Sequence, residues 1–171
     1  MTAELIVLRL VHVLGGIFWV GSVLFNAIFL MPTLAGLGPA AGGVMAGLQR
    51  RRLPTVLPVV AVLTMLSGVR LMQLTAAGFS GAYFASPSGR AYAFGALASI
   101  VGFAVGMGMA RPAMLRAGAL GAEMATAPDE AARATLAAEL ARVRSRGAKG
   151  NAVMLVLLGL AAAAMAVARY L

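Results

Sequence analysis

Residues 12–31 read HVLGGIFWVGSVLFNAIFLM, and after His12 this stretch contains no charged residue. A helix needs about 20 predominantly apolar residues to cross a hydrocarbon core of roughly 30 Å. The run is continuously apolar and lacks the alternation of a membrane β-strand. It therefore predicts a membrane-spanning helix, which we expect to begin near Leu5 and to be closed by Pro32.

Three further uncharged runs have similar lengths, namely Leu53–Val69, Ala91–Ala110 and Asn151–Ala168. The chain of 171 residues is 61% hydrophobic and 11% charged, whereas soluble domains are roughly 45–50% apolar and about 25% charged. These features predict an all-α fold, a polytopic transmembrane four-helix bundle forming a single transmembrane domain over residues 1–171. The expected spans are residues 5–31, 53–76, 91–113 and 150–170.

Basic residues gather in two of the three connections. The chain has 14 Lys and Arg against 5 Asp and Glu, a net charge of +9. Because cytoplasmic loops carry an excess of Lys and Arg, we expect both connections in the cytoplasm and both termini on the periplasmic side of the inner membrane. No soluble basic module accompanies this charge, so we expect no nucleic-acid partner. The connections hold Arg50, Arg51, Arg52, Arg111, Arg116, Arg133, Arg142, Arg144, Arg146 and Lys149.

The third connection is the only sizeable polar segment. Residues 128–130 read PDE, which is typical of a helix start, and apolar residues recur at helical spacing over 136–143. We expect span three to continue to about Met124 and an amphipathic helix to follow over 128–146, ended by Gly147. The result would be a cytoplasmic helical hairpin between helices 3 and 4. It serves either as a connector at the membrane surface or as a docking element for a partner.

One face of the first span is polar or small, and spans two and three offer similar faces. Polar groups are costly in lipid, so we expect these faces to point into the bundle. Small residues also let helices approach closely, and packing alone explains much of the pattern. The residues are His12, Gly15, Trp19, Ser22 and Asn26 in span one, Thr64 and Ser67 in span two, and Tyr92, Gly95, Ser99, Gly102 and Gly106 in span three.

His12 is the only histidine of the chain, and we expect it near the outer ends of spans one and two, at the depth of Arg70. Arg9 and Arg90 should lie slightly higher, with Glu4 the only acid nearby. Three cations with one acid in a low-dielectric region favour an added anion. Haem propionates, a carboxylate ligand and lipid phosphates are the candidates.

A neutral imidazole can bind copper or haem iron. Gly15 and Gly16 would leave room for haem b, and Met72 is a candidate second ligand because thioethers bind Cu(I) and haem iron. Simple packing, proton relay by His12 and interfacial anchoring by the arginines are alternatives. The candidate cofactor-binding residues are His12, Arg9, Arg70, Arg90, Trp19, Gly15 and Gly16, and the candidate metal ligands are His12 and Met72.

The first span resembles the H-x(6)-W-x-G opening of CopD-like membrane proteins, which His12, Trp19 and Gly21 match. That resemblance implies a helical membrane bundle with a role in copper uptake or tolerance. A weaker likeness, histidine followed by tryptophan in the first span, is to haem-binding membrane protoporphyrinogen oxidases. Those enzymes imply a lysine in a later span, whereas the only lysine here is Lys149, outside the expected spans.

The sequence contains no nucleophile–base pair, paired carboxylates, phosphate-binding loop or HExxH motif, which argues against hydrolytic and phosphoryl-transfer chemistry. It contains no cysteine, which excludes disulfides and iron–sulfur clusters. Three hypotheses remain open: a CopD-like protein handling copper or haem, a non-catalytic accessory subunit of a larger membrane complex, and a small b-type membrane cytochrome. The expected partners are membrane lipid and either other membrane proteins or further copies of the chain.

Overall fold

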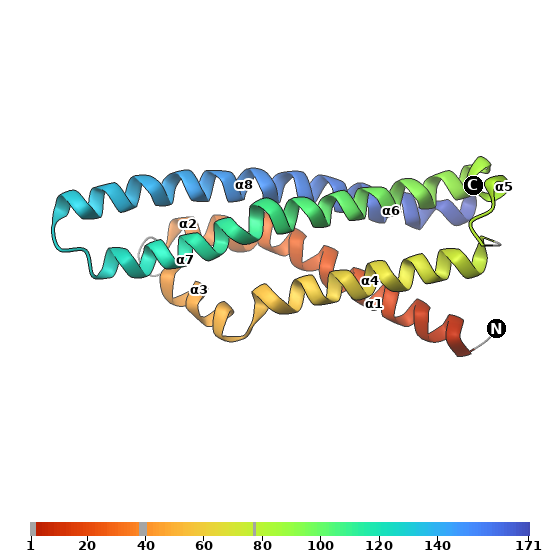
Figure 1. Cartoon of the computed structure of the whole chain (residues 1–171), viewed down its shortest axis with the longest axis horizontal. Helices are drawn as coiled ribbons and strands as arrows, with labels where there is room; N and C mark the ends of the chain where they lie inside the picture. Colours follow the sequence, from red (N-terminus) through yellow and green to blue (C-terminus); the bar gives the residue numbers. More distant parts are fainter. Residues whose placement is uncertain (1–2, 38–40, 77) are drawn as a thin grey trace.

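A computed structural model describes residues 3–37, 41–76 and 78–171, and within these ranges the chain is helical and forms no strand. Four helical segments of the described chain are long and apolar enough to cross a membrane, which confirms the expected all-α fold with four candidate spans. They are Ala3–Gly36, Leu53–Thr75, Pro87–Ala125 and Glu130–Tyr170. The segments form an elongated bundle with both ends of the chain at the same end of the molecule (Figure 1).

Each segment combines one or more regular elements. The first comprises α1 (Ala3–Phe25), the π-helical turn η1 (Asn26–Leu30) and α2 (Met31–Gly36). After α3 (Ala41–Arg50) comes the second spanning segment, α4 (Leu53–Thr75). The short α5 (Gly81–Ala85) precedes the third, which comprises α6 (Pro87–Val105), the π-helical turn η3 (Gly106–Ala110) and α7 (Arg111–Ala125). The fourth comprises α8 (Glu130–Val167) and the 3₁₀ turn η4 (Ala168–Tyr170).

The first and third segments each pass through a proline, Pro32 and Pro112, and do not end there. The residues before them, Met31 and Arg111, donate their N–H groups to the carbonyl five positions earlier. Proline has no N–H, and its ring crowds the carbonyl four positions earlier, so a wider π turn relieves the clash. The expectation that Pro32 closes the first span is therefore wrong, because the helix continues to Gly36.

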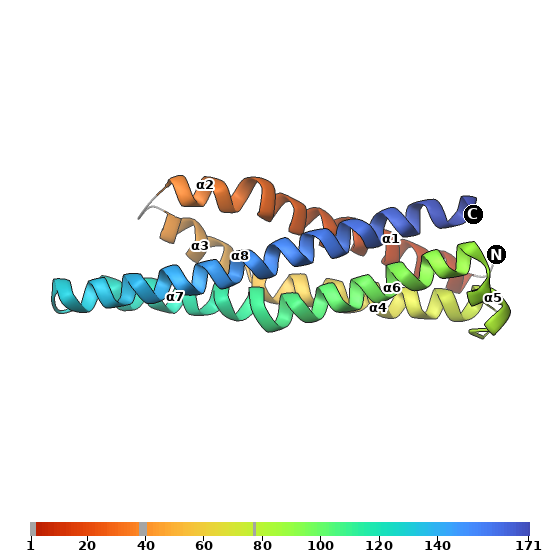
Figure 2. The same cartoon turned by 90° about the horizontal axis from the view of Figure 1, so that it is seen from above.

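The bundle is built from two helix pairs, α1 with α4 and the α6–α7 segment with α8 (Figure 2). The pairs meet around Trp19 and Val23 of α1, Ala61 of α4 and Leu158 of α8, all of which are buried. The Trp19 ring also meets Phe103 of α6 edge-on, with 6.2 Å between centroids. With Phe103 packed against it, this cluster joins all four spanning segments.

The glycine stripe of the third segment packs against α8. A Cβ on Gly95 would lie 2.8 Å from Met165 Cγ, and one on Gly102 would lie 3.3 Å from Leu158 Cδ2. Both glycines are buried. The stripe is therefore a close helix–helix contact of the kind that small residues permit in membranes, and it does not meet the polar face of α1.

The helix α8 runs for 38 residues without interruption, so the expectation that Gly147 ends an amphipathic connector is wrong. A Cβ on Gly147 would lie 3.0 Å from Ala113 Cβ of α7, and one on Gly150 would lie 2.9 Å from Met109 Cβ. Close packing of α8 on its neighbour outweighs the weak helix propensity of glycine. At the other end of the hairpin, Asp129 caps α8 by accepting a 2.7 Å hydrogen bond from Ala132 N–H.

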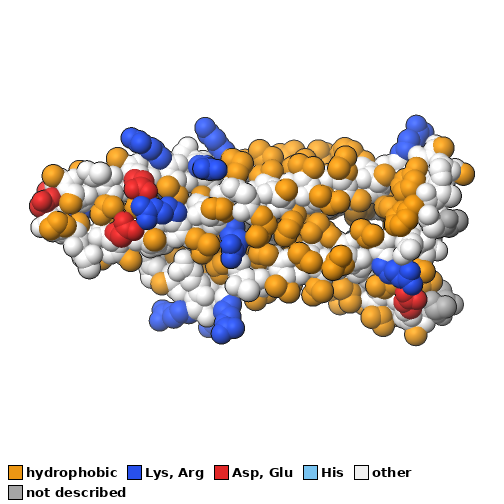
Figure 3. All heavy atoms as spheres, viewed as in Figure 1, with side chains coloured by type: hydrophobic (Ala, Val, Ile, Leu, Met, Phe, Trp, Pro, Cys, Tyr) orange, Lys and Arg blue, Asp and Glu red, His pale blue; other side chains and the backbone are white. Residues whose placement is uncertain are grey.

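Charged side chains are distributed unevenly along the bundle. On the face shown in Figure 3, Lys and Arg side chains gather toward the end where α3, α7 and the start of α8 lie, and a few more mark the end that carries the termini. The band between these ends is apolar (Figure 3). Such a band is the surface that a multi-pass membrane protein presents to lipid.

Candidate functional site

The polar face of α1 meets α4 at His12. The Nδ1 atom of His12 lies 2.8 Å from the backbone carbonyl oxygen of Thr64. A carbonyl oxygen can only accept a hydrogen bond, so Nδ1 carries the proton and donates it. The lone pair of the neutral ring is therefore on Nε2, which is the arrangement in which histidines commonly bind metal ions.

A glycine on α4 makes room for this ring. A Cβ on Gly68 would lie 2.6 Å from Cε1 and 2.8 Å from Nδ1 of His12, so no larger residue fits there without displacing the imidazole. The Thr64 carbonyl also accepts a 2.9 Å hydrogen bond from Ser67 Oγ. Two side chains therefore converge on one backbone oxygen of α4. Sequence reasoning did not place Gly68 at the candidate site, although its position one helical turn after Thr64 was a usable signal.

The space beside Gly15 is filled. The Thr64 side chain packs directly against Gly15, and its Cγ2 would lie 3.8 Å from a Cβ on Gly16. Thr64 is itself buried, and its hydroxyl donates a 2.8 Å hydrogen bond to Val60 O. A flat macrocycle therefore does not fit between α1 and α4 at the glycines that were expected to make room for haem.

Arg70 has its own internal partners. Its guanidinium binds Glu4 through Nε at 2.9 Å and Nη2 at 2.7 Å, and Nη1 donates to Gln73 Oε1 at 2.9 Å. The Arg70 and Glu4 side chains are 44% and 49% exposed, so the pair contributes less than about 1 kcal/mol. The structure brings Arg70 to the same end of α4 as the His12 contact, but its charge is already balanced.

The remaining candidates lie apart from His12. Arg9 is exposed on α1, and Arg90 is exposed in the first turn of α6. Among the described residues neither forms an ion pair or a hydrogen bond with His12 or Arg70. Trp19 is 5% exposed and belongs to the core cluster, so its place in the fold is explained by packing.

Met72 is half-buried on α4, one helical turn beyond Gly68, and so shares the α4 face that meets His12. Within the ranges that the structure describes, no three His, Cys, Asp or Glu side chains come close enough to hold a metal ion together. The site thus offers one imidazole nitrogen of fixed orientation, with the thioether of Met72 one turn beyond Gly68 on the same face of α4. Imidazole and thioether groups are of the kind that soft ions accept as ligands.

No family model, curated protein or solved structure matches this chain. The resemblance to CopD-like proteins therefore stays an expectation, which rests on His12, Trp19 and Gly21 of the first span.

Proposed function

We propose that the chain is a CopD-like protein of the inner membrane in which His12 offers Nε2 to a copper ion near the periplasmic ends of α1 and α4. The observation that carries the proposal is the 2.8 Å hydrogen bond from Nδ1 to the Thr64 carbonyl. It fixes the orientation and the tautomer of the ring, as the hydrogen-bond acceptor behind a metal-ligating histidine does. Four apolar helices of spanning length support the membrane setting.

The packing supports copper over haem b. Cu(I) accepts imidazole and thioether ligands in small numbers, and Met72 lies on the correct face of α4. Haem would need space beside Gly15, which the Thr64 side chain fills. We therefore assign His12 as the principal ligand and Met72 as the second.

The test is a Cu(I) titration of the full chain in an uncharged detergent. Wild type should bind one equivalent, His12→Gln should bind none, and Met72→Leu should bind more weakly. Met107→Leu is the matched control, because Met107 is exposed on η3, away from the α1–α4 contact. Copper binding that survives His12→Gln, or a Soret band that requires His12, would contradict the copper assignment.

The orientation is tested separately, because a chain without cysteine accepts single reporters. Ala82→Cys lies in α5, and Ser145→Cys lies among the basic residues of α8; both positions are exposed. A membrane-impermeant maleimide added to intact spheroplasts should label position 82 only. Labelling of position 145 without permeabilisation would contradict a cytoplasmic hairpin.

A non-catalytic accessory subunit is the second candidate, and it is favoured by the sparse ligand set of the described residues. The α7–α8 hairpin would be its docking element, since Arg116 of α7 ties the two helices through Glu139 of α8. Arg142 and Arg144 are exposed further along α8. This role predicts a native particle of fixed mass larger than the chain, which dissociates when Arg142 and Arg144 are replaced by glutamine. A chain that is monomeric in native extracts would exclude it.

A further inference from the structure

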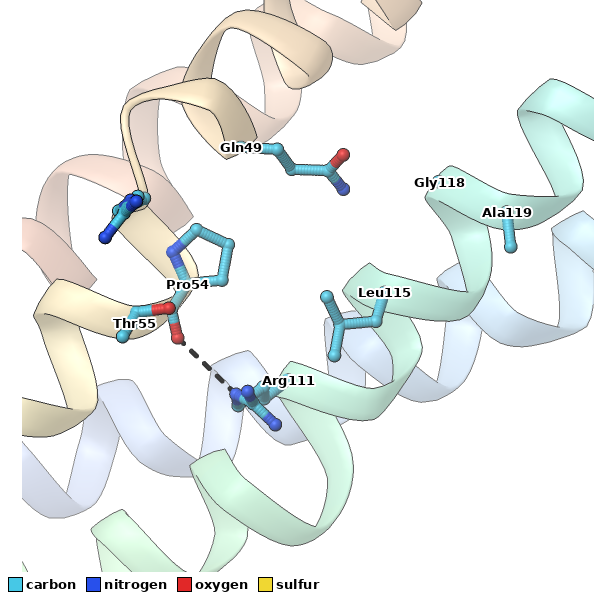
Figure 4. A pocket seen from close by; sticks show the side chains of 8 residues that line it. Gln49, Pro54, Thr55, Arg111, Leu115, Gly118 and Ala119 are labelled. Carbon is cyan, nitrogen blue, oxygen red and sulfur yellow. Dashed lines mark hydrogen bonds between the residues drawn. The ribbon is translucent and has the colours of Figure 1, made fainter.

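At the opposite end of the α1–α4 pair from His12, the α3–α4 turn and α7 border a pocket of about 510 Å³ (Figure 4). Its polar lining comes from Gln49, Arg52, Thr55 and Arg111, and Pro54 and Leu115 contribute apolar surface. None of the described residues that line it is acidic. The pocket therefore combines two permanent positive charges with two uncharged hydrogen-bonding side chains.

Arg111 is held at this pocket by α4. Its Nε donates a 3.4 Å hydrogen bond to the Pro54 carbonyl (Figure 4). Its terminal amino groups form no hydrogen bond with any residue that the structure describes. Arg111 is half-buried, so its charge is screened less by water than that of a surface arginine. Arg52, at the other side, takes a left-handed conformation with φ of 58°, which is uncommon for a residue with a side chain.

Gln49 extends from α3 toward α7 (Figure 4). A Cβ on Gly118 would lie 2.8 Å from Gln49 Nε2, so the glycine allows the amide to approach α7. In the described structure the amide forms no hydrogen bond with another side chain. It is thus a donor at the pocket that a bound group can use.

The chain has no carboxylate left to balance these arginines. All five Asp and Glu residues are described and used elsewhere: Glu4 binds Arg70, Glu123 and Glu139 bind Arg116, Glu130 binds Arg133, and Asp129 caps α8. Two like charges beside one pocket repel each other, and an anion bound between them relieves that repulsion. Such an anion has to come from outside the chain.

The depth of the pocket relative to the apolar band indicates which molecule supplies that anion. Arg52 directly precedes the uncharged run Leu53–Val69, and Arg111 directly follows the uncharged run Ala91–Ala110. Both arginines therefore lie where the apolar band ends, which is the level of the lipid phosphates, and basic pockets between helices bind such head groups. We propose that this pocket binds a phosphate group, supplied by an anionic phospholipid, through Arg52 and Arg111, with Gln49 and Thr55 donating hydrogen bonds.

The test uses the full chain in an uncharged detergent, titrated with short-chain phosphatidylglycerol, phosphatidylcholine or inorganic phosphate, with binding followed by native mass spectrometry. Phosphatidylglycerol should bind and phosphatidylcholine should bind much more weakly. Arg111→Gln and Arg52→Gln should each weaken phosphatidylglycerol binding by about fivefold. Thr55→Val should weaken it less, because it removes a hydrogen bond and no charge.

Arg116→Gln is the matched control. It lies on the same helix as Arg111 and removes the same charge, but its guanidinium already binds Glu123 and Glu139, so affinity should not change. Equal weakening by Arg116→Gln and Arg111→Gln would overturn the site. Inorganic phosphate that binds with the same arginine dependence, while phosphatidylglycerol does not, would overturn the lipid source. Arg52 is exposed, so Arg52→Gln keeps the test decisive if Arg111→Gln fails to fold.

Discussion

The imidazole of His12 occupies the space that a side chain on Gly68 would take, because a Cβ there would lie 2.6 Å from Cε1 of His12. The Nδ1 atom of the same ring lies 2.8 Å from the carbonyl oxygen of Thr64. One turn of α4 thus supplies both the space for the only histidine and its hydrogen-bond acceptor. The position of the ring is set by backbone atoms, which are hard to displace.

The first prediction concerns the tautomer of that ring. We expect the neutral form of His12 to carry its proton on Nδ1, because the Thr64 carbonyl can only accept a hydrogen bond. A single histidine gives a single pair of ring nitrogen resonances, so ¹⁵N NMR of histidine-labelled protein reads the tautomer directly. A proton on Nε2 in the neutral ring would contradict the contact and remove the main support for a metal ligand at that nitrogen.

The second prediction concerns Gly68. Gly68→Ala should displace the His12 ring, shift its nitrogen resonances, and lower the free energy of unfolding by about 1–3 kcal/mol, the usual cost of overpacking. Gly21→Ala is the matched control, since nothing lies within 4 Å of a Cβ at that position of α1. It should leave the resonances unchanged and stabilise slightly, because alanine favours helix over glycine. Denaturation in mixed micelles measures both variants, and equal effects would contradict the proposed contact.

The four spanning helices were predictable because lipid excludes charged side chains, so each span is an uncharged run such as Ala91–Ala110. The helix that each face of a span packs against was not predictable. The stripe containing Gly95 and Gly102 packs on α8 and not on the polar face of α1, and small residues carry no signal that selects between neighbours. The same holds at Gly147, whose contact with α7 overrides the local tendency of glycine to end a helix.

The candidate site was predictable only in part. The sequence shows a single histidine, and the limits of the predicted spans place His12 and Arg70 at similar depths. The pairing of Arg70 with Glu4 and the insertion of Thr64 against Gly15 depend on the rotation of α4 about its axis. A helix with polar or basic residues on several sides, as α4 has, leaves that rotation undetermined by sequence alone.

The third prediction tests the contact between α6 and α8. A Cβ on Gly95 would lie 2.8 Å from Met165 Cγ and 3.2 Å from the Ala161 backbone oxygen. The methionine can move but the backbone cannot, so Gly95→Ala should destabilise the bundle by about 1–3 kcal/mol. Gly159→Ala lies on α8 with nothing within 4 Å of its Cβ and should be neutral or slightly stabilising. Thermal unfolding in detergent compares them, and a neutral Gly95→Ala would contradict the close approach.

The fourth prediction concerns the π turn before Pro112. Pro112→Ala restores an N–H, and a return to regular α-helix would add a hydrogen bond worth about 0.5–1.5 kcal/mol. Removing the extra residue of the turn would, however, rotate α7 by about 100° relative to α6. That rotation would expose Leu120, which is fully buried, at a cost of about 1.5–3 kcal/mol, and would break the Arg116–Glu139 pair. We therefore expect the π turn to persist in Pro112→Ala.

An engineered disulfide between α7 and α8 tests whether α7 has rotated, because the chain has no cysteine of its own. A Cβ on Gly147 would lie 3.0 Å from Ala113 Cβ, close to the distance of about 3.5–4.5 Å that a disulfide requires. Ala113→Cys with Gly147→Cys should therefore cross-link under mild oxidation whether residue 112 is proline or alanine. Ala113→Cys with Ala148→Cys should not, since residue 148 is exposed on another side of α8. Loss of the first cross-link in the Pro112→Ala background would show that the proline, and not the packing of α7 on α8, maintains the turn.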